Sequence, residues 1–306
     1  MRRPVFPMSA LALPEQRDAQ RGQSLVPGPR SLRPEKAVPH EEGSLPCVEE
    51  LDPVAFNDSY ARRCMPVVVR GGAEDWGAIR RWTLPYLRSR LGDLEVPHRR
   101  TPREQPEIGV EDVHLGMTSA SEVLKRCAEP GSSEEYIPGL NLKDCPSLGD
   151  DIAPPAFVDA SRLRSVSIFL GRNTRCLGHF HPFAQAVLTQ VVGEKDVDLY
   201  APRDLGRVYL RNWYEKGFFQ SRVNFHGDHE GQFPRLAEAT RWTVRLRPGD
   251  QLFIPVHWLH VPTGNGMTAS VTHWWRARWQ EWGGPGVGAR CIAGLGMMSI
   301  SDLIGL

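Results

Sequence analysis

The stretch over residues 249–260, which reads GDQLFIPVHWLH, decides how the rest of the chain is interpreted. Its first two residues follow Pro248 and have the composition of a β-turn. The apolar run over residues 251–254 is short and ends at a proline, which is typical of a buried strand. His260 follows, and an imidazole suits iron, zinc, copper or nickel. The stretch therefore predicts a strand that leads to a metal ligand, without naming the metal.

A second pair of histidines precedes this stretch, with His179 and His181 on either side of Phe180. Residues two apart on a strand point to the same side, so both imidazoles can face one ion. An antiparallel pairing would bring His260 beside His179. We therefore expect His179, His181 and His260 to form one metal site. The open alternative for His181 is a histidine near the ion, with water completing the ligand shell.

The other histidines of this half of the chain fit different roles. His257 is expected at the surface of the turn, and His273 in the core or beside the site. His226 and His229 fall in a polar loop over residues 224–231. That loop is expected to be solvated or to line a substrate entrance, because connecting segments run over the surface.

Short β-rich runs dominate the chain from Arg164 onward. Gly193 and the glycine-containing segment 264–266 are among the residues that separate them. Many short strands at this spacing indicate a sandwich or a barrel. The expected strands are residues 165–170, 186–192, 196–200, 242–246, 251–254 and 268–275.

Capping residues mark three helices before this region. The side chain of Ser, Thr or Asp can accept hydrogen bonds from the first N–H groups of a helix. The caps and their helices are Asp52 with a helix from Pro53, Thr83 with 84–91, and Ser119 with 120–128. A buried strand is expected at residues 66–69. The predicted fold class is therefore mainly β with helical additions.

The chain divides into three parts by composition. Residues 1–45 are rich in Pro, Arg, Gln, Glu and Ser and show no sustained period, so we expect a disordered leader. Residues 46–280 hold the predicted helices and strands in one domain. Residues 281–306 begin with glycines and become apolar from Cys291. This tail predicts either a short docking helix or a homodimer contact.

Charge and hydropathy limit the partners. The chain has 37 Lys and Arg against 36 Asp and Glu, a formal net charge of +1, so it lacks a long-range field for nucleic acid or an anionic membrane. The sequence contains no run of about 18 apolar residues, so it predicts no transmembrane helix. The six cysteines form no CxxC pair, which favours free thiols in a reducing compartment. We expect a soluble, cytoplasmic protein with neither a nucleic acid nor a membrane partner.

Taken in order, these motifs resemble the JmjC-type (cupin-like) Fe(II)/2-oxoglutarate oxygenases. That family has an HxD motif, a Gly-x-Lys segment and a GD-x-L-x-I-P segment that ends in W-x-H. This chain has HFH at 179–181, GEK at 193–195 and the stretch over residues 249–260. The similarity covers roughly residues 47–280. It implies a double-stranded β-helix (the jelly roll, or cupin, fold) that holds iron.

The resemblance also implies the residues of a co-substrate pocket. Lys195 matches the lysine that holds the distal carboxylate of 2-oxoglutarate, Tyr136 a tyrosine that helps to bind it, and Thr272 a nearby polar position. The chain departs from the family where His181 replaces Asp or Glu and where Cys176 replaces Ser or Thr. Three neutral imidazoles leave the ion more positive than two histidines and a carboxylate do.

The family's activity implies an enzyme that uses Fe(II), 2-oxoglutarate and O2. Its substrate would be a protein or peptide side chain, or an amino-acid-like small molecule. The HxH motif leaves two alternatives open. One is a three-histidine cupin dioxygenase that does not use 2-oxoglutarate, against which Lys195 counts. The other is a catalytically silent JmjC-like binding or scaffold protein.

Overall fold

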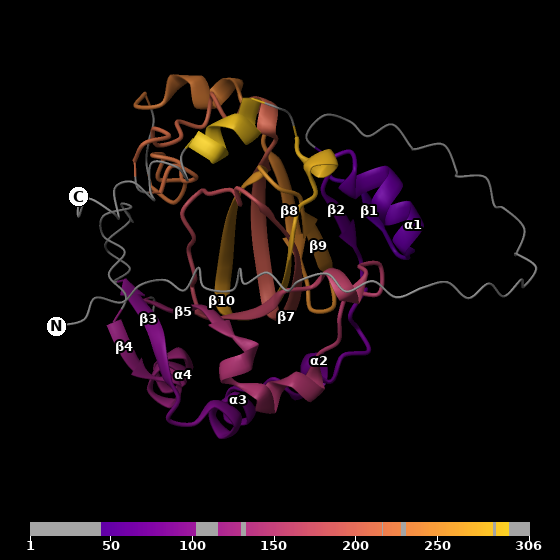
Figure 1. Cartoon of the computed structure of the whole chain (residues 1–306). Helices are drawn as coiled ribbons and strands as arrows, with labels where there is room; N and C mark the ends of the chain where they lie inside the picture. Colours follow the sequence, from indigo (N-terminus) through magenta and orange to yellow (C-terminus); the bar gives the residue numbers. More distant parts are fainter. Residues whose placement is uncertain are drawn as a thin grey trace, which may run out of the picture. The chain divides into compact units, whose positions relative to one another are not determined.

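Two long antiparallel strands, β7 (Ala184–Tyr200) and β10 (Leu259–Arg276), run side by side through the centre of the fold (Figure 1). On its other side β10 pairs with β6 (Ser165–Arg172). The first half of β7 pairs with β9 (Gln251–Ile254), and its second half pairs with β8 (Trp242–Leu246). The strands predicted from the late part of the sequence therefore meet in one hydrogen-bonded sheet.

This computed structural model describes most of the chain after the predicted leader. The described residues are 44–101, 116–129, 133–215, 217–227, 231–283 and 286–293. The predicted leader lies outside them apart from its last two residues, and so does the end of the tail from residue 294. The expectations for those segments stay predictions.

Shorter strands extend the sheet at both edges. They are β1 (Cys47–Val48) and β2 (Val67–Val69) beyond β9, and β5 (Glu134–Asn141), β3 (Glu95–Thr101) and β4 (Gly116–Ser119) beyond β6. The order is β1-β2-β9-β7-β10-β6-β5-β3-β4, with β8 on β7. The described chain is thus mainly β with helical additions, as predicted, and agrees with a jelly roll of the cupin type.

The two central strands are longer than the sequence predicts. Gly193 was expected to end a strand, but β7 continues through it with φ 66°. A Cβ there would lie 2.1 Å from the carbonyl oxygen of Met267, so the position needs glycine. The register shifts between Asn265 and Ala269 on the facing strand. The glycines predicted as turns therefore form a bulge, which bends a strand without ending it.

All three predicted helix caps are present. The carboxylate of Asp52 accepts hydrogen bonds from two N–H groups of α1 (Pro53–Ala55), which continues as a π-helix, η1 (Phe56–Ala61). The hydroxyls of Thr83 and Ser119 each accept one hydrogen bond, at α3 (Leu84–Leu91) and α4 (Ala120–Ala128). The helix α2 (Gly77–Arg81) has no side-chain cap, which explains why capping rules did not predict it.

Buried apolar side chains join the helices to the sheet. Leu87 of α3 and Leu124 of α4 belong to one cluster with Ile137 of β5, Ile168 of β6 and Val271 of β10. All five are fully buried. Burying each side chain of this size contributes about 1.5–3 kcal/mol. This cluster fixes β10 against its neighbours and so fixes the strand that carries His260.

The tail begins with a helix over residues 286–293. Cys291 on this helix is fully buried in a cluster with Phe180 and Leu259, and Val287 packs on the same cluster. The first part of the tail therefore docks on the domain beside the segments that carry the histidines. None of the helices described is both long and apolar enough to cross a membrane.

Asp151, the last residue of the 3-10 helix η3 (Pro146–Asp151), connects that helix to α2 and α3. Its carboxylate accepts hydrogen bonds from Arg81 at 2.7 Å, from the indole N–H of Trp82 at 3.0 Å and from the hydroxyl of Tyr86 at 2.6 Å. Burial by itself would raise the pKa of Asp151. The hydrogen bonds from Tyr86, Arg81 and Trp82 outweigh that effect and hold this pKa below its ordinary value.

We expect Asp151→Ala to lower the free energy of unfolding by about 1–3 kcal/mol, because it leaves the buried indole N–H of Trp82 without an acceptor. Urea denaturation measures this loss, and Asp150→Ala on the exposed neighbour is the control. A carboxyl with a lowered pKa stabilises the fold above its unfolded pKa of about 3.9 and loses that effect as the pH falls. The difference between wild type and Asp151→Ala should therefore shrink below about pH 4. A difference that stays constant there would contradict this role.

Candidate metal centre

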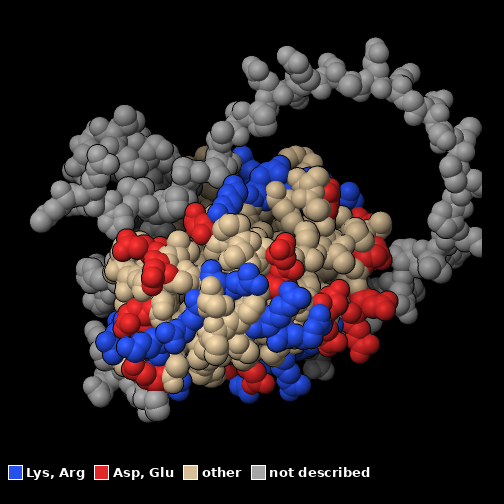
Figure 2. Space-filling view, turned by 90° about the horizontal axis from the view of Figure 1, so that it is seen from below, with Lys and Arg blue, Asp and Glu red and all other residues tan. Residues whose placement is uncertain are grey.

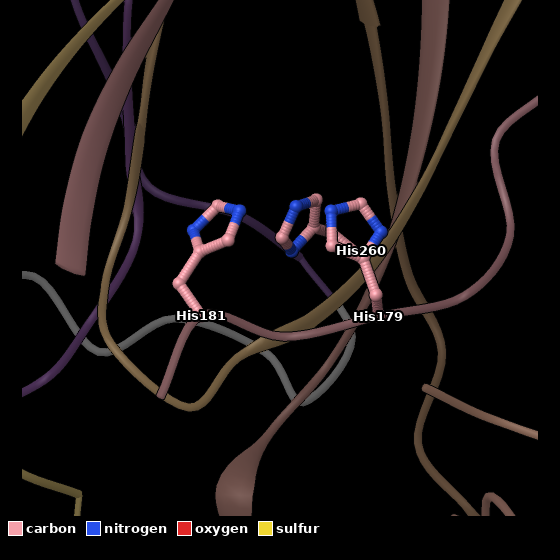
Figure 3. A group of neighbouring side chains, drawn as sticks. All are labelled: His179, His181 and His260. Atoms are coloured by element: carbon pink, nitrogen blue, oxygen red, sulfur yellow. The ribbon is translucent and has the colours of Figure 1, made fainter. Parts of the chain in front are cut away.

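Three histidine side chains meet at one end of the central strands. His260 is the second residue of β10, and His179 pairs with it through two backbone hydrogen bonds of 3.2 and 2.8 Å. His181 follows two residues later, and its imidazole faces the other two (Figure 3). One nitrogen from each ring lies within 4.8 Å of the others. The structure therefore brings together the three residues that the sequence predicted as ligands.

Backbone carbonyls set the protonation of two of these rings. Nδ1 of His179 lies 2.9 Å from the carbonyl oxygen of Leu177, and Nδ1 of His260 lies 2.9 Å from that of Trp258. A carbonyl oxygen only accepts hydrogen bonds, so each Nδ1 carries the proton and donates. Each Nε2 is then left with its lone pair free. A hydrogen bond from the ring nitrogen that does not bind the metal orients a metal-binding histidine and fixes its tautomer.

His181 differs from the other two histidines. Its Nδ1 is buried and has no hydrogen-bond partner among the described residues. Its ring centroid lies 4.6 Å from that of His260 and 4.6 Å from that of Trp274. Aromatic contact on one side and the facing histidine on the other thus hold the ring of His181. Within the described residues, no side-chain hydrogen bond contributes to its position.

The three rings are neutral in the protein. Burial lowers the pKa of each, and for His181 and His260 the neighbouring histidines lower it further, well below the ordinary value. A histidine binds a metal only in its neutral form, so the electrostatics fit a metal site. The group of potential ligands found among the described residues contains no Asp or Glu. Three neutral nitrogen donors fit Fe(II), and they fit zinc, copper and nickel as well.

Lys195 lies in the interior with only 3% of its surface exposed. Its ammonium donates a hydrogen bond of 2.5 Å to the hydroxyl of Ser270 on β10. In the part of the chain that the structure describes, no carboxylate pairs with it. Burial lowers the pKa of Lys195 to about 8, and the nearby thiol of Cys176 opposes this only in part. A buried cation without a counter-ion is costly and suits a pocket that receives an anion.

Tyr136 and Lys195 both lie near the thiol of Cys176. The hydroxyl of Tyr136 lies 3.4 Å from the thiol sulfur of Cys176, the group that also influences Lys195. Tyr136 is buried, and burial raises its pKa well above the ordinary value, so it stays a neutral phenol. The guanidinium of Arg99 lies 5.1 Å from the centre of its ring. The predicted pocket residues Lys195 and Tyr136 are therefore neighbours across Cys176.

Thr272 stands two residues after Ser270 on β10, so both side chains point to the same face of the strand. The hydroxyl of Thr272 is buried and has no partner among the described residues. A buried hydroxyl without a partner costs about 1–3 kcal/mol unless a ligand satisfies it. This hydroxyl is therefore available to a bound molecule.

Sequence reasoning missed Ser270 as the partner of Lys195. The alternation of Thr268, Ser270 and Thr272 along β10 was the signal, because polar side chains at every second position share one face. The prediction for His257 was wrong: its side chain is fully buried, and its Nε2 lies 3.0 Å from the carbonyl oxygen of Pro182.

The loop prediction was only partly right. His226 is half-buried, not free in solvent, and its Nε2 lies 2.7 Å from the carbonyl oxygen of Cys176. The ring of Phe225 packs so closely on Gly178 that an added Cβ would lie 2.4 Å from it. This loop therefore lies against the segment before His179. His229 is outside the described residues.

With this geometry established, known proteins give the family. A family model described as a cupin-like domain matches residues 53–281, and the chain belongs to that family. The chain is 25% identical over 227 residues to lysine-specific demethylase 8 of Xenopus tropicalis, covering 72% of this chain and 50% of that protein. It is 25% identical over 255 residues to tRNA wybutosine-synthesizing protein 5 of Danio rerio, covering 77% and 76%.

A third relative is lysine-specific demethylase JMJ30 of Arabidopsis thaliana, which is 28% identical over 223 residues. That match covers 69% of this chain and 49% of the relative. The chain thus spans about half the length of the two demethylases. The predicted resemblance to JmjC-type proteins is confirmed, and the family is one with demethylases among its members.

The unpaired ammonium of Lys195 gives a stability prediction. Lowering its pKa from 10.5 to about 8 corresponds to a penalty of about 3 kcal/mol on the folded state. We expect Lys195→Met to raise the free energy of unfolding at pH 7 by about 1–3 kcal/mol in the absence of ligand. The penalty on the folded state is full below the folded pKa of Lys195 and disappears as the pH rises towards its unfolded pKa. The stability gained by Lys195→Met should therefore fade in alkaline buffer.

Urea denaturation at pH 7 and at alkaline pH measures this gain. Lys143→Met, at an exposed lysine, is the matched control and should change little at either pH. A Lys195→Met variant that is less stable than wild type at pH 7 would show that the ammonium has a partner that stabilises it.

Proposed function

We propose that this protein is an Fe(II)- and 2-oxoglutarate-dependent oxygenase. The observation that carries the proposal is the buried, unpaired ammonium of Lys195 in a cupin-like domain that also gathers three neutral histidines. A metal site alone would fit several chemistries. A metal site with an interior cation fits a small co-substrate that is both a chelator and an anion, as 2-oxoglutarate is.

Each residue of the candidate site would have a defined task. His179, His260 and His181 would hold the iron through neutral nitrogens. The iron, when bound, would supply the oxidation of a substrate C–H bond by O2, with 2-oxoglutarate converted to succinate and CO2. The ammonium of Lys195 would pair with the distal carboxylate of the co-substrate, and the neutral hydroxyl of Tyr136 would donate to the same carboxylate.

The absence of a carboxylate from the three-histidine group favours an anionic co-substrate. Neutral imidazoles leave the full double charge of a ferrous ion uncompensated, whereas a carboxylate ligand would remove half of it. A dicarboxylate such as 2-oxoglutarate would lower the charge at the ion by one through its keto-acid end and give Lys195 its counter-ion through the other carboxylate. Replacement of Asp by His therefore strengthens the electrostatic attraction for such a molecule.

The proposed substrate is a protein or peptide side chain, or an amino-acid-like small molecule. The names of two relatives refer to lysine demethylation, and a third refers to tRNA wybutosine synthesis. A tRNA would call for a basic surface. The net charge is +1, and on the face that Figure 2 shows, basic side chains lie interspersed with acidic ones. These observations favour a substrate other than nucleic acid.

The use of 2-oxoglutarate can be tested without knowing the substrate. Fe(II) is titrated into the protein under anaerobic conditions, with and without 2-oxoglutarate, and visible absorption is recorded. We expect a metal-to-ligand charge-transfer band only when both are present. Lys195→Met should still bind Fe(II) but should need about 10- to 100-fold more 2-oxoglutarate for the same band, because it loses one charged hydrogen bond.

The other outcomes assign the chain to the alternatives. Iron binding without the band would overturn the proposal and favour a three-histidine cupin dioxygenase, which the donor set also fits. Failure to bind iron at all would favour a silent binding or scaffold protein. Lys143→Met, at an exposed lysine, is the control for the substitution and should behave as wild type.

A further inference from the structure

We infer that His257 is a positioning residue that holds His181 in place as the third metal ligand. The inference rests on the proposed metal site. It concerns a histidine that is not itself part of the group of potential ligands. Among the described residues, the Nδ1 of His181 has no hydrogen-bond partner, whereas the Nδ1 of His179 and of His260 each donate to a backbone carbonyl. The position of His181 therefore needs another support.

The support of the three histidines is unequal. His179 and His260 exchange two backbone hydrogen bonds, and each ring also donates to a carbonyl two residues before it. His181 has neither the reciprocal pairing nor the ring hydrogen bond. In Figure 3 the ring of His181 lies across from that of His179, with the ring of His260 between them. The position of His181 therefore depends on how the backbone at residues 181 and 182 is held.

His257 binds both of these backbone positions. Its N–H donates to the carbonyl oxygen of His181 at 3.2 Å, and its Nε2 donates to the carbonyl oxygen of Pro182 at 3.0 Å. Two consecutive carbonyls are thus attached to one residue. Two hydrogen bonds fix the distance between this backbone segment and His257, and they also restrict rotation of the segment. They therefore fix the direction in which the side chain of His181 leaves the backbone.

The conformation of His257 indicates that this attachment is needed. Its φ is 68°, in the left-handed region that favours glycine and costs other residues about 1–2 kcal/mol. Its side chain is fully buried, with the rings of Phe180 and Trp282 centred 5.9 and 5.6 Å away. Glycine would remove the strain but would also remove the Nε2 donor. The residue that stands here keeps the strain and keeps the second hydrogen bond.

The turn that carries His257 also leads directly into β10. His260 is three residues further on, so the same short segment supplies one ligand and supports another. His179, in turn, is held by His260. Movement of this turn would displace all three histidines together, whereas loss of the His257 side chain alone should affect only His181. That difference makes the inference testable.

The test uses Co(II) as the probe, because its visible d–d bands report both binding and coordination geometry without any co-substrate. We expect His257→Gly to weaken Co(II) binding about 10-fold and to change the band intensities, as loss of groups that orient ligands does. His257→Gln can place an amide N–H near the position of Nε2 and should recover most of the affinity. Val123→Ala, a buried change in α4 and in a different hydrophobic cluster, controls for loss of stability.

A double-mutant cycle separates positioning from general packing. In a His181→Ala background, His257→Gly should have no further effect on the Co(II) affinity, because the ligand that it positions is already gone. Equal weakening in both backgrounds, or no weakening in either, would overturn the inference. Thermal unfolding of each variant without metal confirms that all of them fold.

The outcomes also separate this inference from the proposed function. An interaction between His257 and His181 in the cycle, with no charge-transfer band from Fe(II) and 2-oxoglutarate, would leave the inference standing and overturn the proposed function. A charge-transfer band together with additive effects in the cycle would do the reverse. A wild-type protein that does not bind Co(II) at all would overturn both.

Discussion

The pair of backbone hydrogen bonds between His179 and His260 is the interaction on which the candidate site depends. It joins a segment before β7 to the start of β10, and these two strands form the centre of the sheet. The pairing places two imidazoles with their centroids 4.3 Å apart. Everything else at the site is arranged around this pair: the third histidine, the turn that supports it and the loop that lies against residue 178. Shifting the register of β10 by one residue would turn His260 to the other face and remove the site.

Charge is the second constraint on this region. The interior holds one ammonium and three neutral imidazoles, and no carboxylate among the described residues belongs to the histidine group or pairs with Lys195. Two buried carboxylates of the described chain each pair with an arginine: Glu134 with Arg99, and Asp151 with Arg81. Lys195 has no such charged partner among the described residues. Under the proposed function, a bound co-substrate would supply the anion.

The sequence predicted most of this arrangement, because spacing and turn chemistry act locally. The caps at Thr83 and Ser119 are present for that reason, and His179, His181 and His260 lie together as expected. What failed depended on partners far along the chain. Gly193 reads as a turn until the carbonyl of Met267 is known to lie against it. His257 reads as a surface residue until Pro182 is known to accept its hydrogen bond. No local pattern encodes either contact.

Several departures from ordinary folding rules lie at this site. His257 keeps a left-handed backbone, Lys195 an unpaired buried charge, and the buried polar atoms of Thr272 and His181 lack partners among the described residues. Each of these features costs stability, and apolar or glycine replacements would remove the cost. A protein that used its domain only as a scaffold would gain by such replacements and lose nothing. The presence of these features around one group of histidines therefore favours a site that binds a ligand over a domain that serves only as a scaffold.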